Sequence, residues 1–137
     1  MTVAYLALGA NLGDRARNLA EARRLLGERG ANLLRESAIR ETEPFGVTDQ
    51  PLFLNQVVEV EWSGGPRDLL DAAKAVEAAV GRRPTYRWGP REIDVDILLF
   101  GDETVTDTDL VIPHPGLRDR DFVLEPLAEL RPDLARR

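Results

Sequence analysis

Apolar residues recur along the chain with the period of a strand in some segments and of a helix in others. Residues 3–8 form an apolar strand candidate, and residues 9–13 are rich in glycine and asparagine, which predicts a turn. Asp14 is a predicted helix N-cap. Gly27 and Gly30 are expected to stop this helix. Its apolar residues share one face: Leu19, Ala22, Leu25 and Leu26.

The middle of the chain predicts two strands separated by a loop. Residues 31–42 are a weaker strand candidate, and residues 43–51 form a loop with two prolines and a glycine that is long enough to bind a ligand. Residues 53–62 alternate like a strand. One face of this strand carries Leu54, Val58, Val60 and Trp62, and the other carries Phe53 and Asn55.

A second amphipathic helix and a last strand follow. Gly65 is the predicted cap of the helix, Pro66 its first residue and Gly81 its end. Its apolar stripe consists of Leu69, Ala73, Val76 and Val80. After an arginine-bearing loop, residues 94–100 form a strand, and residues 112–116, "IPHPG", form a rigid loop.

The predicted order is strand, helix, strand, strand, helix, strand, with a tail. This order is typical of an α+β, ferredoxin-like split βαβ fold, in which an antiparallel sheet has its helices on one face and a substrate site on the other. We expect residues 1–137 to form one domain, because this length encloses a single core. The first and fourth strands are expected at the centre of the sheet, as the floor of the site.

Composition narrows the classes of function. The formal net charge of −6 argues against general nucleic-acid binding, which calls for a basic surface. The chain has no cysteine, so it can form neither disulfides nor a thiolate metal site. No apolar run approaches the roughly 20 residues of a membrane span. We therefore expect a cytoplasmic monomer whose partners are small molecules, with no nucleic acid and no membrane among them.

Two aspartates carry the main chemical signal, because Asp94 and Asp96 interrupt the apolar run "IDVDILLF". Alternate side chains of a strand share a face, so the two residues point the same way, with Cα atoms about 6.5 to 7 Å apart. Two like charges at a sheet surface need compensation by arginines, water or a metal. Carboxylates together with substrate phosphates suit Mg²⁺.

A cationic segment precedes these aspartates. Residues 78–91 contain no acid and four arginines: Arg82, Arg83, Arg87 and Arg91. The common glycine-rich phosphate loops are absent, so a nucleotide would have to be bound in another way. A metal held by carboxylates, together with arginines, can bind its phosphates. The alternative is a solvated loop beside exposed ion pairs.

Three further candidate residues are also compatible with purely structural roles. His114 is the only histidine, which excludes a multi-histidine zinc site and leaves a structural role open. Phe53 and Phe122 fit a ligand platform, but residues of this kind are more often core residues.

Several segments, taken in order, resemble one family over nearly the whole chain. They are "ALGANLGD" (7–14), "TEPFG" (42–46), "DQPLFLNQVVEVE" (49–61), "RWGPREIDVDILLFG" (87–101) and "IPHPGLRDRDFVLEPLAEL" (112–130). Together they resemble 6-hydroxymethyl-7,8-dihydropterin pyrophosphokinase, an enzyme of folate biosynthesis. The segment at 87–101 is the most specific of them.

The resemblance implies transfer of the β,γ-diphosphate of ATP to the hydroxymethyl group of the pterin, with release of AMP. It implies that Asp94 and Asp96 bind two Mg²⁺ ions that bridge the triphosphate, which agrees with the chemistry of phosphoryl transfer. It assigns catalytic roles to Arg82, Arg91 and Asp96.

The resemblance also assigns the contacts to each substrate. Phe53 and Phe122 would sandwich the pterin ring, Asn55 would hydrogen-bond its edge, and Trp88 would close over both substrates on a mobile loop. The full pterin set is Thr42, Phe45, Phe53, Asn55, Trp88 and Phe122. The ATP set is Arg82, Arg83, Arg91, His114, Arg118 and Arg120.

Two alternatives of a different kind stay open at this point. A small-molecule sensor of the same fold class would show no binding synergy between ATP and pterin. Another Mg²⁺-dependent phosphotransferase or nucleotidyltransferase would use a different acceptor and release a product other than AMP.

Overall fold

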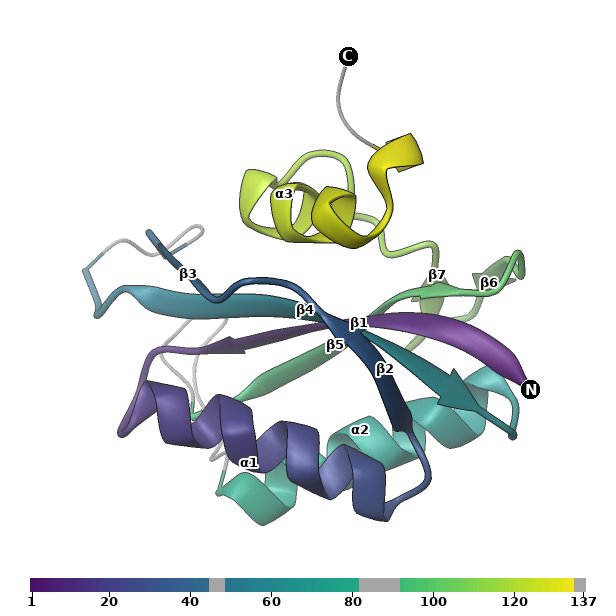
Figure 1. Ribbon diagram of the computed structural model, residues 1–137, viewed down its shortest axis with the longest axis horizontal. Helices are drawn as coiled ribbons and strands as arrows, with labels where there is room; N and C mark the ends of the chain where they lie inside the picture. Colours follow the sequence, from purple (N-terminus) through teal and green to yellow (C-terminus); the bar gives the residue numbers. More distant parts are fainter. Residues whose placement is uncertain (45–48, 82–91, 135–137) are drawn as a thin grey trace.

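The computed structural model describes residues 1–44, 49–81 and 92–134. Its centre is a five-stranded sheet in which every described pairing is antiparallel (Figure 1). The predicted α+β, ferredoxin-like class is confirmed. The strand order is β2 (Asn32–Glu36), β4 (Phe53–Trp62), β1 (Thr2–Ala10) and β5 (Asp94–Phe100), and β3 (Arg40–Thr42) also pairs with β4.

The centre of the sheet is β1 with β4, so the prediction that the first and fourth strands are central is wrong. The fourth strand, β5, lies at the end of the described strand order and pairs with β1. Each helical connection skips one strand position, so that β4 lies between β1 and β2, and β1 lies between β4 and β5. The apolar pattern could not reveal this interleaving, because tertiary packing selects the neighbours of a strand.

The predicted strand over residues 31–42 is two strands, β2 and β3. Ser37 lies in the break, where its hydroxyl oxygen accepts a hydrogen bond from the Val57 N–H at 2.9 Å. The Ser37 N–H in turn donates to the Val57 carbonyl at 2.9 Å. A side-chain bond thus replaces a ladder bond, and the strand bends before it pairs with β4 again.

Two helices cover one face of the sheet, as predicted (Figure 1). Asp14 caps α1 (Arg15–Glu28) by accepting a backbone N–H of the first turn at 3.2 Å. Gly65 caps α2 (Pro66–Val80), and Gly81 ends it with φ 111°, a left-handed conformation that glycine adopts without strain.

α1 runs through Gly27 to Glu28, and Gly30, at φ 98°, follows its end.

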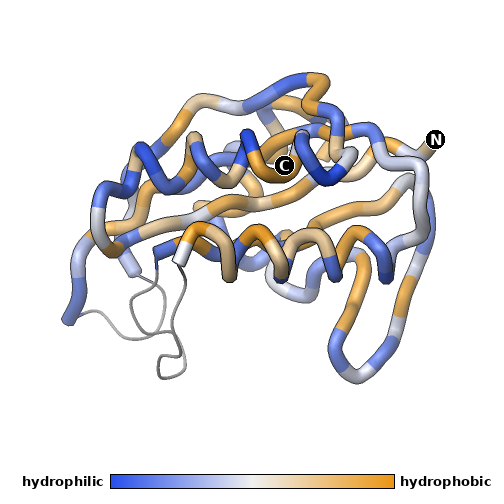
Figure 2. The backbone as a smooth tube through the Cα atoms, turned by 90° about the horizontal axis from the view of Figure 1, so that it is seen from below, coloured by the Kyte–Doolittle hydropathy of each residue, from blue (hydrophilic) through white to orange (hydrophobic). Residues whose placement is uncertain are grey.

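The space between these helices and the sheet is an apolar core. Figure 2 shows α1 and α2 side by side, with hydrophobic and hydrophilic stretches alternating along each helix. The largest fully buried side chains on this side are Leu6, Leu8, Leu19, Leu26, Leu69, Ile93, Phe100 and Ile112. The predicted core faces of the two helices are therefore confirmed.

A third helix, α3 (Asp121–Leu130), which the sequence analysis did not predict, lies on the opposite face (Figure 1). Its apolar residues pack against Tyr5, Val57 and Leu98 of the sheet. The sequence pattern concealed it because Pro126 lies inside it and its N-cap is Arg120 instead of a common capping residue. A short 3₁₀ turn, η1 (Pro132–Leu134), follows it.

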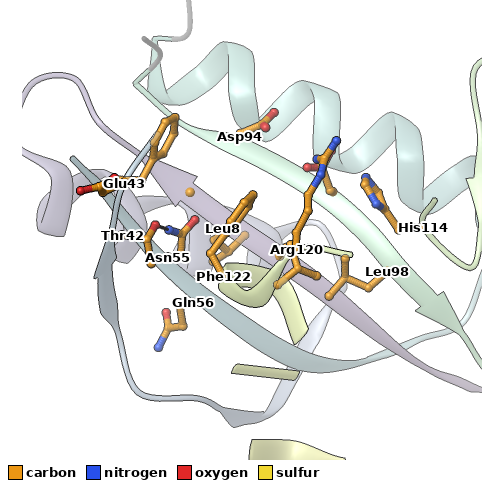
Figure 3. A pocket seen from close by; sticks show the side chains of 15 residues that line it. Leu8, Thr42, Glu43, Asn55, Gln56, Asp94, Leu98, His114, Arg120 and Phe122 are labelled. Carbon is orange, nitrogen blue, oxygen red and sulfur yellow. Dashed lines mark hydrogen bonds between the residues drawn. The ribbon is translucent and has the colours of Figure 1, made fainter. Parts of the chain in front are cut away.

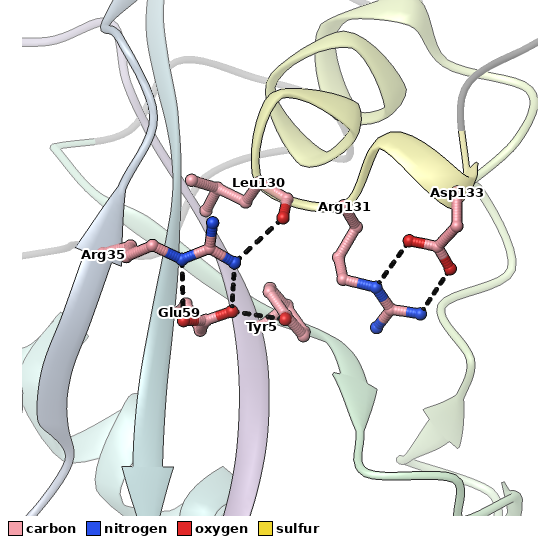
Figure 4. A network of polar contacts seen from close by, with 6 residues as sticks. All are labelled: Tyr5, Arg35, Glu59, Leu130, Arg131 and Asp133. Carbon is pink, nitrogen blue, oxygen red and sulfur yellow. Dashed lines mark hydrogen bonds and ion pairs between the residues drawn. The ribbon is translucent and has the colours of Figure 1, made fainter.

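Polar contacts hold the C-terminal end of α3 on the sheet (Figure 4). Glu59, which is 7% exposed, accepts a hydrogen bond from the Tyr5 hydroxyl and two from Arg35 at 3.0 and 2.8 Å. Arg35 also donates to the Leu130 carbonyl at 2.9 Å. The Arg131 guanidinium lies 5.5 Å from the centre of the Tyr5 ring. This network joins three strands to the end of one helix.

A small hairpin of β6 (Val105–Thr106) and β7 (Val111–Ile112) follows β5. Arg67, at the start of α2, fastens this hairpin through Asp107 and Asp109 at 2.8 to 2.9 Å. Over residues 1–44, 49–81 and 92–134, no helix is long and apolar enough to cross a membrane.

Candidate active site

An open pocket with about 740 Å³ of empty space lies beside α3, on the face of the sheet that α1 and α2 leave free (Figure 3). β1, β3, β4, β5, α3 and the loops around them all contribute to its wall. The lining residues are Ala7, Leu8, Gly9, Thr42, Glu43, Phe53, Asn55, Gln56, Asp94, Asp96, Leu98, His114, Arg120, Phe122 and Val123.

The fold brings together eight of the predicted site residues, which come from segments far apart in the sequence. They are Thr42, Phe53, Asn55, Asp94, Asp96, His114, Arg120 and Phe122. Arg118 is exposed and is not among the lining residues. The other predicted residues lie outside the described part of the chain: Phe45, Arg82, Arg83, Trp88 and Arg91.

The floor of the pocket is β1, where Gly9 faces Asn55 of β4 on one side and Asp94 of β5 on the other. A Cβ atom on Gly9 would lie 3.0 Å from Asn55 Oδ1 and 3.6 Å from Phe53 Cδ1. Glycine at this position therefore keeps the floor low. The sequence predicted a turn over residues 9–13, whereas β1 continues to Ala10.

One half of the pocket presents aromatic rings and an amide. Asn55 is 8% exposed, and its Nδ2 donates a hydrogen bond to the Thr42 hydroxyl. This bond fixes the amide plane, and Oδ1 is the Asn55 atom nearest to the floor at Gly9. Phe122 projects into the pocket from α3 (Figure 3), and Phe53 lines it from β4. Such a combination suits a flat heterocycle with a polar edge.

The other half carries both aspartates. Asp94 and Asp96 are half-buried on β5, opposite Gly9 and Ala7 of β1. Their placement on one face confirms the predicted alternation of the strand. The small residues opposite them leave the carboxylates open to the pocket.

A bulge in β5 changes which face of the sheet the side chains at the end of the strand point to. The register with β1 shifts between Tyr5 and Leu6, so that Leu99 faces Tyr5 while Ile97 faces Leu6. Strict alternation would turn Phe100 toward the pocket face, but Phe100 belongs to the core between the sheet and α1 and α2. The bulge thus gives the strand a polar pocket end and an apolar core end.

His114 and Arg120 complete the polar half. His114 Nδ1 accepts a hydrogen bond from the Gly116 N–H at 3.0 Å, which leaves Nε2 as the protonated nitrogen of the neutral ring. Burial, followed by the charge of Arg120, lowers the pKa of His114 below its ordinary value of 6.5, while the charge of Asp94 opposes that shift. Figure 3 shows Arg120 reaching from the start of α3 toward β5, between Phe122 and His114.

The donor set of the pocket fits Mg²⁺. No group of three or more His, Cys, Asp or Glu side chains that could enclose a metal occurs within the described ranges. Two carboxylates with open space beside them match the way in which proteins hold Mg²⁺ together with substrate phosphates and water. Asp94 and Asp96 are therefore the residues that would hold the metal.

Sequence reasoning missed several lining residues. Ala7 and Gly9 form the floor, and Val123 and Leu98 form apolar wall. Glycine within an apolar strand can signal a close approach of a ligand to the backbone, so Gly9 did carry a detectable signal. The positions of the others depend on strand pairing and on α3.

Comparison with known proteins identifies the family. Residues 5–132 match the family model described as "7,8-dihydro-6-hydroxymethylpterin-pyrophosphokinase (HPPK)". The chain belongs to this family. The resemblance carried by the sequence motifs is thereby confirmed.

Curated relatives extend the match to HPPK proteins over almost the full chain. The chain is 47% identical over 135 residues to 2-amino-4-hydroxy-6-hydroxymethyldihydropteridine pyrophosphokinase of Methylorubrum extorquens, covering 98% of this chain and 85% of the relative. It is 45% identical over 129 residues to the Bacillus subtilis protein of the same name, covering 93% and 77%. An Arabidopsis thaliana mitochondrial folate synthesis bifunctional protein is 44% identical over 125 residues, covering 91% of this chain and 23% of that protein.

Solved structures share the HPPK fold at low identity. A Plasmodium falciparum HPPK-DHPS crystal structure superimposes with a TM-score of 0.73 at 18% identity, covering 97% of this chain. Another HPPK-DHPS structure gives a TM-score of 0.70 at 15% identity, covering 96%. The chain spans 40% of the length of each of these solved chains.

Proposed function

We propose that this chain transfers the β,γ-diphosphate of ATP to the hydroxymethyl oxygen of 6-hydroxymethyl-7,8-dihydropterin, giving AMP and the pterin diphosphate for folate biosynthesis. The observation that carries the proposal is the meeting of two unlike halves in one pocket. Aromatic rings and an amide line one half, and carboxylates with a histidine and an arginine line the other. A flat heterocycle suits the first half, and a metal-bound triphosphate suits the second.

The pterin half would bind and orient the acceptor. Phe53 and Phe122 hold the ring between them, and Asn55 hydrogen-bonds its edge while Thr42 keeps the amide in place. This arrangement presents the hydroxymethyl oxygen toward β5. Holding the two reactants in line removes much of the entropic cost of a bimolecular displacement.

The reaction is an in-line displacement at the β-phosphorus. The hydroxymethyl oxygen forms a bond to that phosphorus, and the bond to the oxygen bridging the α- and β-phosphates breaks, so that AMP leaves with the bridging oxygen. The proton of the hydroxymethyl group is released. Charge accumulates on the phosphate oxygens during the transfer, and the protein must stabilise it.

The polar half supplies that stabilisation. Asp94 and Asp96 would hold two Mg²⁺ ions, which neutralise phosphate charge when bound. Arg120 and the Nε2–H of a neutral His114, which both line the pocket, would donate to phosphate oxygens. We assign further phosphate contacts to Arg82, Arg83, Arg91 and Arg118, and catalytic roles to Arg82, Arg91 and Asp96.

Product analysis is the primary test. The chain is incubated with ATP, Mg²⁺ and 6-hydroxymethyl-7,8-dihydropterin, and AMP is resolved from ADP. We expect AMP and pterin diphosphate in equal amounts, dependent on both substrates. ADP as product would indicate another phosphotransferase, and binding without turnover would indicate a sensor.

Binding measurements locate the pterin. Asn55→Ala and Phe53→Ala should weaken pterin binding much more than ATP binding in calorimetry, because both side chains lie in the aromatic half. Asn32→Ala, at an exposed position of β2, is the matched control. Equal losses for both ligands would contradict the assignment of the two halves.

Three wider expectations from the sequence stay predictions. They are a single domain over residues 1–137, a monomeric state and a cytoplasmic location. Light scattering of the purified chain tests the second of these directly.

A further inference from the structure

A buried carboxylate lies behind the strand that carries the two aspartates. Glu77, on α2, is 7% exposed, and its Oε2 accepts a hydrogen bond from the Val95 N–H at 2.8 Å. Val95 is the residue between Asp94 and Asp96. This contact joins α2 to the residue between the two candidate metal ligands, and its two residues are 18 positions apart in the sequence.

The topology explains why this backbone group needs a side-chain partner. β5 is the end strand of the described sheet and is paired with β1 on one side. The backbone N–H groups on its other side face no neighbouring strand among residues 1–44, 49–81 and 92–134. Val95 is 5% exposed, so its N–H would be costly to bury without an acceptor.

Capping one N–H does not by itself require a charge. Burying a carboxylate costs more than burying a neutral amide, and the neighbouring residues on this face of α2 are apolar: Ala73 and Val76. A hydrogen bond to a carboxylate is shorter and stronger than one to a neutral acceptor. The arrangement gives β5 a firm anchor on the side where strand pairing is absent.

The position of the anchor matters because Asp94 and Asp96 lie on either side of it. Val95 lies opposite Leu8 of β1, but its N–H points away from β1 and donates to Glu77, so this contact holds β5 on the side that β1 does not reach. A movement of β5 here would displace both carboxylates together.

We propose that Glu77 is a positioning residue that fixes the separation and direction of Asp94 and Asp96 through the Val95 N–H. The inference rests on the proposed function of those aspartates as metal ligands. Groups that orient metal ligands typically change metal affinity by 10- to 100-fold when they are removed.

The test compares two near-isosteric substitutions. Glu77→Met removes the acceptor and fills the same volume with an apolar chain, whereas Glu77→Gln keeps an acceptor oxygen and removes the charge. Asp71→Ala, an exposed carboxylate of the same helix, is the control. If Glu77→Met does not fold, Glu77→Ala replaces it, because water can then reach the Val95 N–H.

The first readout does not depend on turnover. Mn²⁺ binding is measured by electron paramagnetic resonance in the presence of α,β-methylene-ATP, and exchange of the Val95 amide hydrogen is followed by nuclear magnetic resonance. We expect Glu77→Met to weaken Mn²⁺ binding about tenfold and to speed exchange at Val95. Glu77→Gln keeps a weaker acceptor and should lose less than Glu77→Met, and Asp71→Ala should resemble the wild type.

The second readout separates positioning from general damage. The Mg²⁺ concentration for half-maximal AMP formation should rise about tenfold in Glu77→Met, with kcat at saturating Mg²⁺ within about threefold of wild type and pterin binding unchanged. Unchanged Mn²⁺ binding in Glu77→Met would overturn the proposal, and so would an equal loss in Glu77→Gln. Failure of the proposed function would be distinguishable, because the wild type would then make no AMP.

Discussion

On the face of the sheet beneath α3, two rows of facing residues lie four positions apart along β4. One row is Arg35, Glu59 and Tyr5, and the other is Arg40, Asn55 and Gly9. The first row ends on Leu99 of β5, and the second ends on Asp94. The rows begin on β2 and β3 respectively, and both then cross β4, β1 and β5 with a polar residue on β4. The side chains of the first row, the closed row, bond to one another, whereas the second row, the pocket row, lines the pocket.

The closed row satisfies its polar groups internally. Arg35 and the Tyr5 hydroxyl both bond to Glu59, and Arg35, which stays exposed, also donates to the Leu130 carbonyl at the end of α3 (Figure 4). The Arg35 hydrogen bonds hold the pKa of the Glu59 carboxyl below its ordinary value of 4.5. Burial, followed by the neighbouring Glu59, raises the pKa of Tyr5 above 10.0. The charges of Glu59 and Arg35 therefore stabilise the fold in this row.

The main difference between the rows is on β1, where the pocket row has Gly9 and the closed row has Tyr5. Gly9 leaves open the space that a side chain would fill, and Arg40 turns away to Glu125 and Glu129 of α3, both at 3.2 Å. α3 therefore contributes its N-terminal residues here, including Arg120 and Phe122, as pocket wall. The C-terminal end of α3 thus packs on the closed row, whereas residues at its N-terminal end line the pocket.

The largest expected effect separates the two pocket carboxylates, Asp94 and Asp96, from Glu59 of the closed row. Asp94→Asn and Asp96→Asn should each lower AMP formation by roughly a hundredfold or more, since a bound metal stabilises the transition state by several kcal/mol. Neither should cause a large fall in melting temperature, because neutralising one of two like charges relieves repulsion. Glu59→Gln should behave in the opposite way, losing stability and keeping activity.

Asp102→Asn, in the exposed turn after β5, serves as the control for these variants and should resemble the wild type. A large drop in melting temperature with activity retained in Asp96→Asn would contradict the metal-site proposal. Turnover assays with AMP detection and thermal unfolding by circular dichroism supply both measurements.

A smaller effect is expected when the floor of the pocket row is raised. Gly9→Ala places a Cβ atom 3.0 Å from Asn55 Oδ1, and such overpacking typically costs about 1 to 3 kcal/mol. We expect pterin affinity to fall about tenfold and ATP affinity to change little, by isothermal calorimetry. Gly27→Ala is the matched control, because nothing lies within 4 Å of its added Cβ. Unaltered pterin affinity in Gly9→Ala would show that the floor does not determine ring binding.

The closed row makes a pH-dependent contribution to stability. Because folding lowers the pKa of Glu59, its contribution is complete above the unfolded-state pKa near 4.5 and is lost as pH falls through the lower folded-state value. Glu59→Gln should cost about 1 to 2 kcal/mol at pH 7, and the difference from wild type should shrink below pH 4.5. Urea unfolding at several pH values measures this. A difference that is independent of pH would indicate lost packing in place of lost charge.

The smallest effect concerns the charge balance of the pocket. The pKa of His114 is lowered by burial and by Arg120, and raised by Asp94. Asp94→Asn should therefore lower this pKa further, and Arg120→Ala should raise it. Titration of the His114 ring in the metal-free protein by nuclear magnetic resonance checks both signs. Shifts in the same direction in both variants would show that conformational change dominates over direct charge.

The sequence by itself determined the local elements of this protein and the identity of its chemical groups. Asp14, Gly65 and Gly81 specify helix ends through bonds within a few residues, and the period of two on β5 places Asp94 and Asp96 on one face. These features depend on backbone geometry over short distances, which the local sequence encodes. Shared motifs were also sufficient to identify the family, because they follow the order of the chain.

Only the tertiary structure decided which elements meet. The interleaving that puts β1 and β4 at the centre, the bulge in β5 and the placement of α3 over the second face all depend on pairing across long stretches of sequence. Gly9 looks like part of a turn until β1 is paired on both sides, and Glu77 looks like any helical glutamate until β5 lies beside α2. Periodicity records which face of an element is buried, but strand pairing and side-chain contacts decide against which partner it is buried.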